Sequence, residues 1–323
     1  MVWYNKKMND ENYFVDIQKT FVDYELNSSF LKLLGGSKQT KSALRDVTFQ
    51  IPQGEHITIF GHSAAGKSTL LRLLTGIIKP TSGHVHVNGR APQYTKHIAA
   101  GYVSAEESEP SKETCHKILS AFARTHDVNN SSSQITKISD ALKLSSVLFT
   151  RADQLSTSQK IRLNLARAAL SDSPLVLLDD TADHLGAQTM RRLLGTLFSG
   201  RTVILTTRFA DTAEKMKLPL LLLHKGTIAH QGTVDQIAAE ISCPRIIDIW
   251  IEGLRYDLLR KLRQHAGVIE ARLIPSSRFS GQLLRVTLHS SRYIPAMYDL
   301  ISQAPLIKVT ELPPSFTDII SRL

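Results

Sequence analysis

A short segment early in the chain carries the residue types most able to do chemistry. Residues 61–69 read Gly-His-Ser-Ala-Ala-Gly-Lys-Ser-Thr and follow a strand-like apolar run at residues 57–60. This is the phosphate-binding pattern G-x-x-x-x-G-K-[ST], placed in the strand-to-helix context that the pattern requires. In such a loop, glycines let the backbone turn its amides inward, a lysine supplies a compact charge, and a hydroxyl offers a magnesium ligand.

The pattern gives each residue of the loop an expected role. Gly61 and Gly66 should shape the loop, Lys67 should contact the β- and γ-phosphates, and Ser68 should bind Mg2+. A chance match before an unrelated helix is the alternative, but the largely apolar residues 70–74 argue against it. The chain is therefore predicted to bind a nucleoside triphosphate. Its expected contacts are Gly61, His62, Ser63, Ala64, Ala65, Gly66, Lys67, Ser68 and Thr69.

A second candidate lies at the end of a predicted buried strand. Residues 175–178 are continuously apolar, as strands of parallel sheets usually are, and Asp179 and Asp180 follow them. A carboxylate at the tip of such a strand holds magnesium in phosphate-loop enzymes, so we expect Asp179 to bind the metal together with Ser68. Between the two motifs, residues 155–159 open a strongly amphipathic predicted helix.

Strands that alternate with helices predict an α/β core built on a mainly parallel sheet. Residues 105–155 differ from the rest, because they are polar and helix-prone, and they are expected to form a helical insertion. Predicted strands cover residues 14–24, 44–51, 57–60, 84–88, 175–178, 203–206 and 220–223; predicted helices cover about 66–76 and 158–171, and residues 25–42 are expected to form a loop.

From about residue 246 the pattern restarts in the order β-α-β-β-α-β, which is the ferredoxin-like arrangement. The predicted strands are 246–251, 268–274, 283–288 and 307–312, the predicted helices are 256–264 and 295–302, and a short helix over 315–323 ends the chain. We therefore expect an N-terminal tail at 1–13, a nucleotide-binding domain at 14–240 and a small α+β accessory domain at 243–323.

Composition limits the class of protein without deciding its partner. Cys115 and Cys243 lack metal-ligand spacing, which indicates a reducing compartment and no disulfide framework. No signal peptide is visible, and no run approaches the ~18 apolar residues needed to span a bilayer. The net charge of +10 suits nucleic acid or an anionic membrane, but the basic residues are scattered. Charge alone therefore leaves both open.

Taken together, these motifs and their spacing resemble the nucleotide-binding subunit of an ABC transporter over about residues 14–238. Residues 155–159 stand where this family carries its L-S-G-G-Q signature, and Tyr24 stands where the family stacks an aromatic ring on adenine. Residues 225–233 resemble the strand-turn-strand that follows the last core strand. The resemblance implies a P-loop ABC ATPase core with a mainly parallel sheet, an antiparallel subdomain and the helical insertion.

The C-terminal domain is similar to the ferredoxin-like domain appended to many ATPases of ABC-2 type exporters. The loop before residues 43–47 and the segment 87–90 resemble the polysaccharide and teichoic-acid export branch. The resemblance implies a two-chain sandwich that holds ATP and Mg2+ between one chain's phosphate loop and the other chain's signature. Ser156 and Gln159 would there contact the γ-phosphate. The implied partners are a membrane permease and a second ABC ATPase chain, a copy of this chain or a more intact paralogue, at the cytoplasmic face of the cell membrane.

Departures from the family pattern are concentrated at positions that serve hydrolysis. Asp180 stands where the family has its catalytic Glu, and it is one methylene shorter. Arg208 replaces the switch His and can neither accept a hydrogen bond nor exchange a proton. Ala105 takes the place of the usual Gln, with Glu106 and Glu107 beside it. Loss of a positioned base or its partners typically costs about 10²–10⁴ in rate, so we expect catalysis by Asp180 and Arg208 to be slow or lost.

Other departures affect loop geometry. Gly186 occupies the family's D-loop Asp position, Thr157 and Ser158 replace both signature glycines, and Ala64 replaces a glycine of the phosphate loop. Added side chains narrow the access of the backbone to a phosphate. The residues expected to bind MgATP are kept, whereas those that position water are altered.

Three functions are compatible with this sequence. The first is an energy-coupling ABC subunit that drives a permease. The second is a regulatory or structural module in which ATP only holds a dimer together. The third, a soluble ABC protein that acts on nucleic acid, fits the net charge of +10. However, one nucleotide-binding unit and an ABC-2-like C-terminal domain favour a permease, so no nucleic acid is expected.

Overall fold

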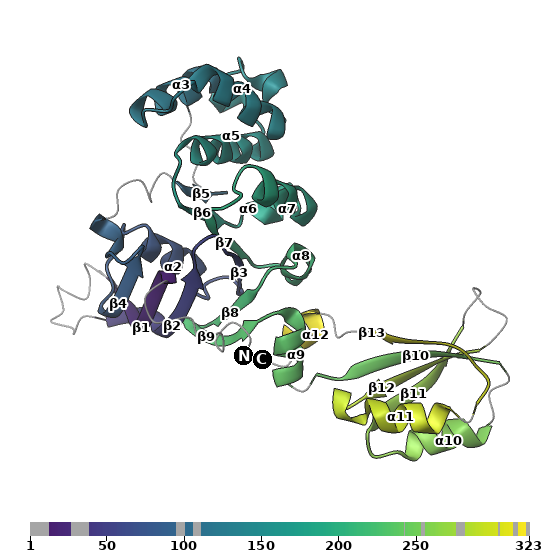
Figure 1. Ribbon diagram of the computed structural model, residues 1–323. Coiled ribbons are helices and arrows are strands. Elements are labelled where there is room, and N and C mark those ends of the chain that lie inside the picture. The colour runs from purple at the N-terminus through teal and green to yellow at the C-terminus, as the bar shows by residue number, and fades with distance from the viewer. Residues whose placement is uncertain are drawn as a thin grey trace. The chain divides into compact units, whose positions relative to one another are not determined.

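The computed structural model describes residues 13–26, 39–94, 101–105, 111–241, 243–252, 256–275, 282–302, 304–312 and 316–320. The chain forms two compact units, which divide between Gln231 and Gly232 (Figure 1). Glu106, Glu107 and nearly all of the predicted tail at 1–13 lie outside the described residues.

A six-stranded sheet forms the centre of the first unit. Its strands are β3 (His56–Phe60), β5 (Tyr102–Ser104), β6 (Leu175–Asp179), β7 (Thr202–Thr207), β8 (Leu220–His224) and β9 (Thr227–Gly232). Their order is β5-β6-β7-β3-β8-β9, and the first five pair in parallel. β6 and β7 are buried along their whole length, as strands covered on both faces must be. The predicted α/β core on a mainly parallel sheet is confirmed.

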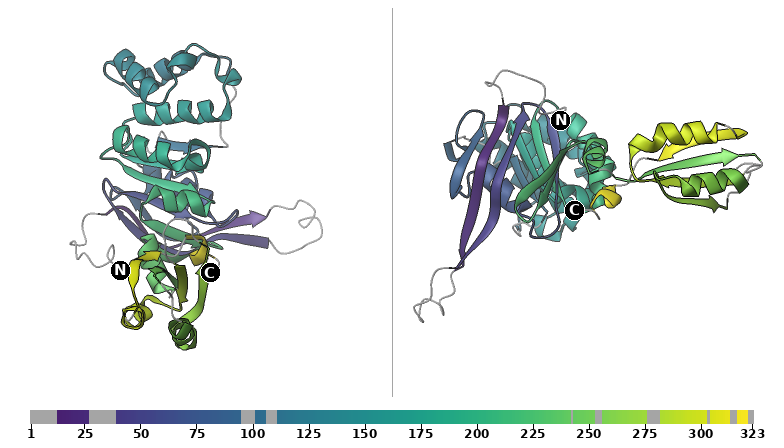
Figure 2. Two further views of the ribbon diagram at one scale, coloured as in Figure 1. Left: turned by 90° about the vertical axis from the view of Figure 1, so that its right-hand side faces the viewer. Right: turned by 90° about the horizontal axis from the view of Figure 1, so that it is seen from below.

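A separate antiparallel sheet contains β1 (Tyr13–Leu26), β2 (Gln39–Pro52) and β4 (Ser82–Val87) in the order β2-β1-β4. The expected loop at 25–42 is wrong at both ends, because β1 and β2 stay paired as far as Leu26 and Gln39. Tyr24, Thr40 and Lys41 in this ribbon are exposed, so no apolar alternation marks it in the sequence. Figure 2 shows the paired strand ends reaching beyond the rest of the unit.

Helix α2 (Lys67–Leu74) packs between these two sheets. It contacts β6 of the large sheet and β2 and β4 of the small one. Leu70, Leu71, Leu73 and Leu74 are each 1% exposed or less. They share one core with Phe49 of β2, Ile59 of β3 and Val85 of β4. Burial of a Leu side chain contributes about 1.5–3 kcal/mol, so this helix is anchored from both sides.

The predicted helical insertion is present in the described part of residues 105–155. It contains α3 (Cys115–Thr125), α4 (Ser131–Ala141) and the short turns η3 (Ser145–Val147) and η4 (Ala152–Gln154), and it leads into α5 (Thr157–Leu170). Leu119, Ile135 and Leu165 from the three helices join one buried cluster. The other helical segments of the first unit are η1 (Pro92–Tyr94), α6 (Thr181–Leu185), α7 (Ala187–Thr196) and α8 (Ala210–Met216).

The second unit contains the predicted ferredoxin-like order. After α9 (Val234–Glu240) come β10 (Arg245–Ile251), α10 (Tyr256–Gln264), β11 (Val268–Ile274), β12 (Gln282–Leu288), η5 (Ser291–Tyr293), α11 (Ile294–Ile301), β13 (Leu306–Leu312) and α12 (Phe316–Ile320). The antiparallel sheet has the order β11-β12-β10-β13, and α10 and α11 cover one face of it (Figure 1). Leu262 and Met297 from these helices pack on Ile249.

In neither unit does a described helix combine the length and the apolar character required to cross a bilayer.

One ion pair lies on the sheet face of the second unit that α10 and α11 do not cover. Asp248 is 5% exposed and accepts hydrogen bonds from Nε and Nη2 of Arg285, its cross-strand neighbour, at 2.7 and 2.8 Å. Removing one member of a buried pair leaves an uncompensated charge, which costs about 3–5 kcal/mol when both groups are buried. The Arg285 side chain is 29% exposed, so a smaller cost is expected here.

We predict that Arg285→Met destabilises the second unit by about 2–3 kcal/mol, whereas the double variant Asp248→Leu with Arg285→Met recovers most of that loss. Arg272→Met is the matched control, because Arg272 is an exposed arginine of the neighbouring strand. Hydrogen exchange of the β10 and β12 amides measures the stability of this unit. Equal destabilisation by the single and double variants would contradict the prediction.

Candidate functional site

Residues 61–66 connect β3 to α2 and form a tight loop. A Cβ on Gly61 would lie 2.6 Å from the carbonyl oxygen of Leu223 and 2.9 Å from the Cβ of Ala65. Gly66 has φ +106°, and a Cβ there would lie 2.7 Å from the carbonyl oxygen of Ala43. Gly61 is therefore required for a close approach of the backbone, and Gly66 is required both for a close approach and for its backbone angle.

Ala64 lies in the same loop with φ +62°, in the left-handed region that L-residues rarely adopt. The side chain is exposed, so the strain comes from the backbone and not from packing. Residues held in this region cost of order 1–3 kcal/mol and persist where the surroundings fix them. The loop therefore keeps a geometry that its own residue disfavours.

The Lys67 side chain lies over this loop. It is 7% exposed, and its Nζ donates hydrogen bonds to the carbonyl oxygens of Gly61 and His62 at 2.9 and 3.4 Å. The ammonium group is thus fixed beside the loop backbone by two neutral acceptors. A fixed cation in a glycine-shaped loop is suited to hold phosphate oxygens, as the sequence predicts for Lys67.

The structure brings Tyr24 to the same place. Its hydroxyl donates to Oγ1 of Thr69 at 3.4 Å, and its side chain is 38% exposed. Ser68 and Thr69 lie in the first turn of α2, while Ser63 is exposed. The exposed His62 ring packs edge-on against Phe60 of β3, with ring centroids 5.7 Å apart. The Tyr24 ring therefore offers an aromatic face beside the phosphate loop.

Asp179 is buried at the end of β6, with 6% exposure. Its Oδ1 accepts from Oγ1 of Thr206 at 2.6 Å, and its Oδ2 accepts from the Tyr102 hydroxyl at 3.2 Å. Metal-binding carboxylates are commonly oriented by such hydrogen bonds and keep further lone pairs for the metal. The geometry of Asp179 therefore suits the magnesium role predicted for it with Ser68.

Asp180 belongs to the same electrostatic group. Its Oδ1 accepts a hydrogen bond from Thr206, and its backbone lies in the left-handed region at φ +51°. Burial raises the pKa of Asp180, and the charges of Asp179 and Asp183 raise it further, whereas Lys67 and the Thr206 hydrogen bond lower it. Three carboxylates therefore share this corner of the sheet with the ammonium group of Lys67.

Asp183, Thr206 and Tyr102 are residues of this cluster that the sequence reasoning missed. Asp183 accepts from Oγ1 of Thr207 at 2.5 Å and from the backbone amide of Arg208 at 3.4 Å. The signal was present in the sequence, because parallel strands β6 and β7 end at the same edge and Thr206-Thr207 end β7. The predicted residue Arg208 contacts this cluster through its backbone amide. Its exposed guanidinium lies 5.2 Å from the Phe209 ring centroid.

The signature segment occupies the start of α5. Ser156 caps this helix, since its Oγ accepts from the Gln159 amide at 3.3 Å and its own amide donates to Oε1 of Gln159 at 2.9 Å. Within the described ranges, no hydrogen bond joins Ser156 or Gln159 to residues 61–69. Among the described residues, the two predicted contact residues therefore hydrogen-bond each other and not this chain's phosphate loop.

Comparisons with known proteins identify the family. Residues 44–183 match the ABC transporter family model. The chain is 30% identical over 243 residues to a Nod factor export ATP-binding protein I of Bradyrhizobium sp. (strain SNU001), covering 71% of this chain and 78% of the relative. The corresponding protein of Rhizobium johnstonii is 28% identical over 308 residues, covering 91% and 94%.

Solved structures show the same fold. An ATP-binding subunit of an ABC transporter superposes with a TM-score of 0.59 at 20% identity, covering 70% of this chain and 92% of the other. A dimeric ATP-binding cassette bound to ADP and Pi superposes with a TM-score of 0.55 at 20% identity, covering 68% and 98%. Fold and loop thus define a P-loop protein of the ABC ATPase class. The chain belongs to the ABC transporter family of ATP-binding proteins.

Lys67→Ala should weaken MgATP binding about 10–100-fold, because a hydrogen bond to a charged group contributes about 1.5–3 kcal/mol. Lys79→Ala is the matched control, since Lys79 is an exposed lysine just after α2. Isothermal titration of the full chain with MgATP gives both affinities. Unchanged affinity in Lys67→Ala would remove the phosphate role from this loop.

Ala64→Gly should stabilise the first unit by about 1 kcal/mol, because glycine adopts φ +62° without the strain of alanine. This gain exceeds the conformational entropy that glycine adds to the unfolded chain, because the strain of alanine at this backbone angle is the larger of the two free energies. Urea unfolding of wild type and variant measures the difference. A destabilised Ala64→Gly protein would show that the backbone strain is absent.

Proposed function

We propose that this chain is the ATP-binding subunit of an ABC-2 type membrane exporter. MgATP bound between two such chains would drive a separate permease, while hydrolysis at this chain's own site is slow or lost. The observation that carries the proposal is the contrast within one site. Lys67 is fixed over a phosphate loop that keeps Gly61 and Gly66, whereas the Arg208 guanidinium lies on Phe209.

In this proposal each part of the chain has a binding task. Loop amides and Lys67 hold the phosphates, Ser68 and Asp179 hold Mg2+, and Tyr24 supports the adenine. The remaining contacts of the loop are His62, Ser63, Ala64, Ala65 and Thr69. The bound MgATP would supply the group that joins two chains, and its phosphoanhydride would be cleaved slowly or not at all at this chain's own site. The proposed nucleotide-binding domain covers residues 14–240, so it includes α9 of the second compact unit, and the proposed accessory domain covers residues 243–323.

Slow hydrolysis follows from the chemistry of two side chains. Asp180 is one methylene shorter than Glu, so its carboxylate reaches less far toward an attacking water. Thr206 holds that carboxylate by a hydrogen bond. Arg208 can neither accept a hydrogen bond nor exchange a proton, so it does not replace a histidine that senses the γ-phosphate.

Export and the need for a second chain have separate support. The Rhizobium johnstonii relative, an export ATP-binding protein by its name, matches 91% of this chain, so the similarity extends into the accessory domain. Ser156 and Gln159 form a capping box at the start of α5 and do not hydrogen-bond the described part of this chain's phosphate loop. This arrangement suits a nucleotide site completed by a second ABC chain, either a copy of this chain or a more intact paralogue. The finer assignment is the polysaccharide and teichoic-acid export branch, at the cytoplasmic face of the cell membrane.

A second candidate is a regulatory module in which ATP only holds a dimer together. The altered positions Asp180 and Arg208 support this module and the exporter subunit equally, because neither function requires ATP hydrolysis at this chain's own site. A role on nucleic acid has only the net charge of +10 in its favour. Co-purification of the chain with a membrane permease separates the exporter from both alternatives.

Restoring the family residues tests the proposed loss of hydrolysis. Asp180→Glu combined with Arg208→His should raise the ATPase rate of the full chain at least tenfold, since a positioned base contributes about 10²–10⁴. Adding Lys67→Ala to that variant should abolish the gain. ATPase activity is measured with and without the co-purified permease.

Asp180→Asn in the wild-type background is the matched control and should leave the low rate unchanged. A wild-type rate of about 1–10 s⁻¹, within the usual range of enzymes, that is lost in Asp180→Asn would contradict the proposal.

A further inference from the structure

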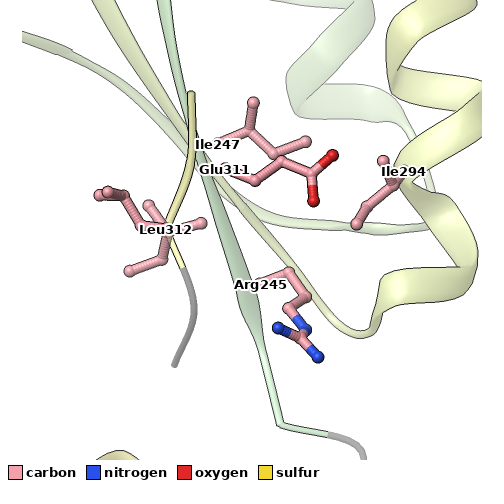
Figure 3. A pocket seen from close by; sticks show the side chains of 6 residues that line it. Arg245, Ile247, Ile294, Glu311 and Leu312 are labelled. Carbon is pink, nitrogen blue, oxygen red and sulfur yellow. The ribbon is translucent and has the colours of Figure 1, made fainter. Parts of the chain in front are cut away.

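The second unit contains a cavity that the nucleotide site does not involve. It has a volume of about 190 Å³ and lies where β10 begins, where β13 ends and beside the first turn of α11 (Figure 3). Its lining residues are Arg245, Ile246, Ile247, Ile294, Glu311 and Leu312. All of them belong to residues 232–323, so the cavity exists within one unit.

The position of two charged residues in this lining is unusual. Ile247 of β10 is the cross-strand partner of Glu311 of β13, and Arg245 precedes Ile247 by two residues. Because side chains alternate along a strand, all three lie on the same face of the sheet. This is the face that α10 and α11 cover, where Ile247 and Ile249 join the apolar core. At the end of this sheet face, an arginine and a glutamate therefore stand at positions where apolar residues would continue the core.

Exposure to solvent explains why charged residues are tolerated there. The cavity lies beside Ile294, where α11 begins, and at this end of the sheet Glu311 is exposed and Arg245 is half-buried. Figure 3 shows Glu311 and Ile247 on the side of the sheet that faces Ile294, with the Arg245 side chain below them. Leu312 lies on the other side of β13. The cavity therefore has an apolar floor, with the Arg245 cation and the Glu311 anion at its rim.

The two charged groups differ in what holds them. The Tyr298 hydroxyl donates to Oε1 of Glu311 at 3.0 Å and fixes the carboxylate. Burial raises the pKa of Tyr298, and Glu311 raises it further, so the phenol stays protonated and remains a donor. In the described part of the chain, no hydrogen bond or ion pair engages the Arg245 guanidinium. Arg245 and Glu311 thus face one cavity without forming an ion pair with each other.

We propose that this cavity binds a small zwitterion of the α-amino-acid class with an aliphatic side chain. Arg245 would hold the carboxylate through two parallel hydrogen bonds, and Glu311 would hold the ammonium group. Ile247 and Ile294 would contact the side chain. A volume near 190 Å³ is below the ~300–1,000 Å³ of drug-sized sites, which limits the ligand to a single small metabolite. No part of this inference depends on ATP binding.

The test is equilibrium binding of L-leucine to the full-length chain, measured by titration calorimetry without nucleotide. The expected dissociation constant is of order 0.1–1 mM, as ligand efficiency allows for so few atoms. N-acetyl-leucine lacks the ammonium group and leucinamide lacks the carboxylate, so each should bind at least tenfold more weakly. Arg245→Gln and Glu311→Gln should each reduce leucine affinity at least tenfold.

Matched controls separate a lost contact from a damaged fold. Arg245→Lys keeps the charge but loses the two-point contact, so it should bind leucine with an intermediate affinity. Arg272→Gln and Glu270→Gln change an exposed arginine and glutamate of β11 and should bind like wild type.

Three results would overturn the proposal. The first is no binding at 10 mM leucine, about tenfold above the weakest expected constant. The second is equal affinity in wild type and in the Arg245 and Glu311 variants. The third is N-acetyl-leucine binding as tightly as leucine, which would mean that Glu311 does not recognise the ligand.

Discussion

The burial of helix α2 between two sheets is the constraint on which the candidate nucleotide site depends. Its leucines pack on both sheets, and Lys67 is the first residue of the helix. The loop before it is fixed from outside as well. The Gly226 amide donates to the carbonyl oxygen of Ala65 at 2.9 Å, and the Arg45 amide donates to that of Gly226 at 2.8 Å. The turn between β8 and β9 therefore links the phosphate loop to β2.

The carboxylate cluster follows from the strand order. β6 and β7 are parallel neighbours, so Asp179 and Thr206 end at the same edge of the sheet. The single hydroxyl hydrogen of Thr206 is shared between Asp179 at 2.6 Å and Asp180 at 3.2 Å, and the Thr207 hydroxyl donates to Asp183. Hydrogen-bond donors and one ammonium group offset the repulsion of three carboxylates that burial would otherwise make costly. The cluster is therefore linked to Lys67 by charge as well as by position.

Much of the fold could be predicted where one local pattern decides the structure. The continuous apolar run at 175–178 and the alternating strands of the second unit have boundaries within one residue of those predicted, and α10 and β11 agree at both ends. The pairing of β1 with β2 beyond Tyr24 could not be predicted, because backbone hydrogen bonds between exposed polar residues leave no periodic signal. The local sequence pattern is thus sufficient to predict a helix or strand only where burial of its side chains stabilises that element.

For the candidate site, the residue types were readable but their partners were not. Tyr24 and Thr69 are distant in sequence and meet only because β1 and α2 share a core. Ser156 and Gln159 read as nucleotide contacts, yet each also satisfies the other in a capping box. Both side chains act as acceptors in that capping box, so the Ser156 hydroxyl hydrogen and the Gln159 side-chain amide group remain donors for a phosphate.

Ala64 and Asp180 both have left-handed backbone angles, but this conformation costs more free energy at the alanine than at the aspartate. Asp is one of the residues that adopt this conformation more readily, because its short side chain can accept hydrogen bonds, and Oδ1 of Asp180 accepts from Thr206 at 3.2 Å. Alanine has no such compensation, so the loop around Ala64 must be held by its surroundings at a cost of order 1 kcal/mol. The chain therefore preserves the shape of the phosphate loop against local preference. In the proposed function, Asp180 and Arg208 replace the expected catalytic residues, a contrast that would separate the requirement to bind a phosphate from the requirement to cleave one.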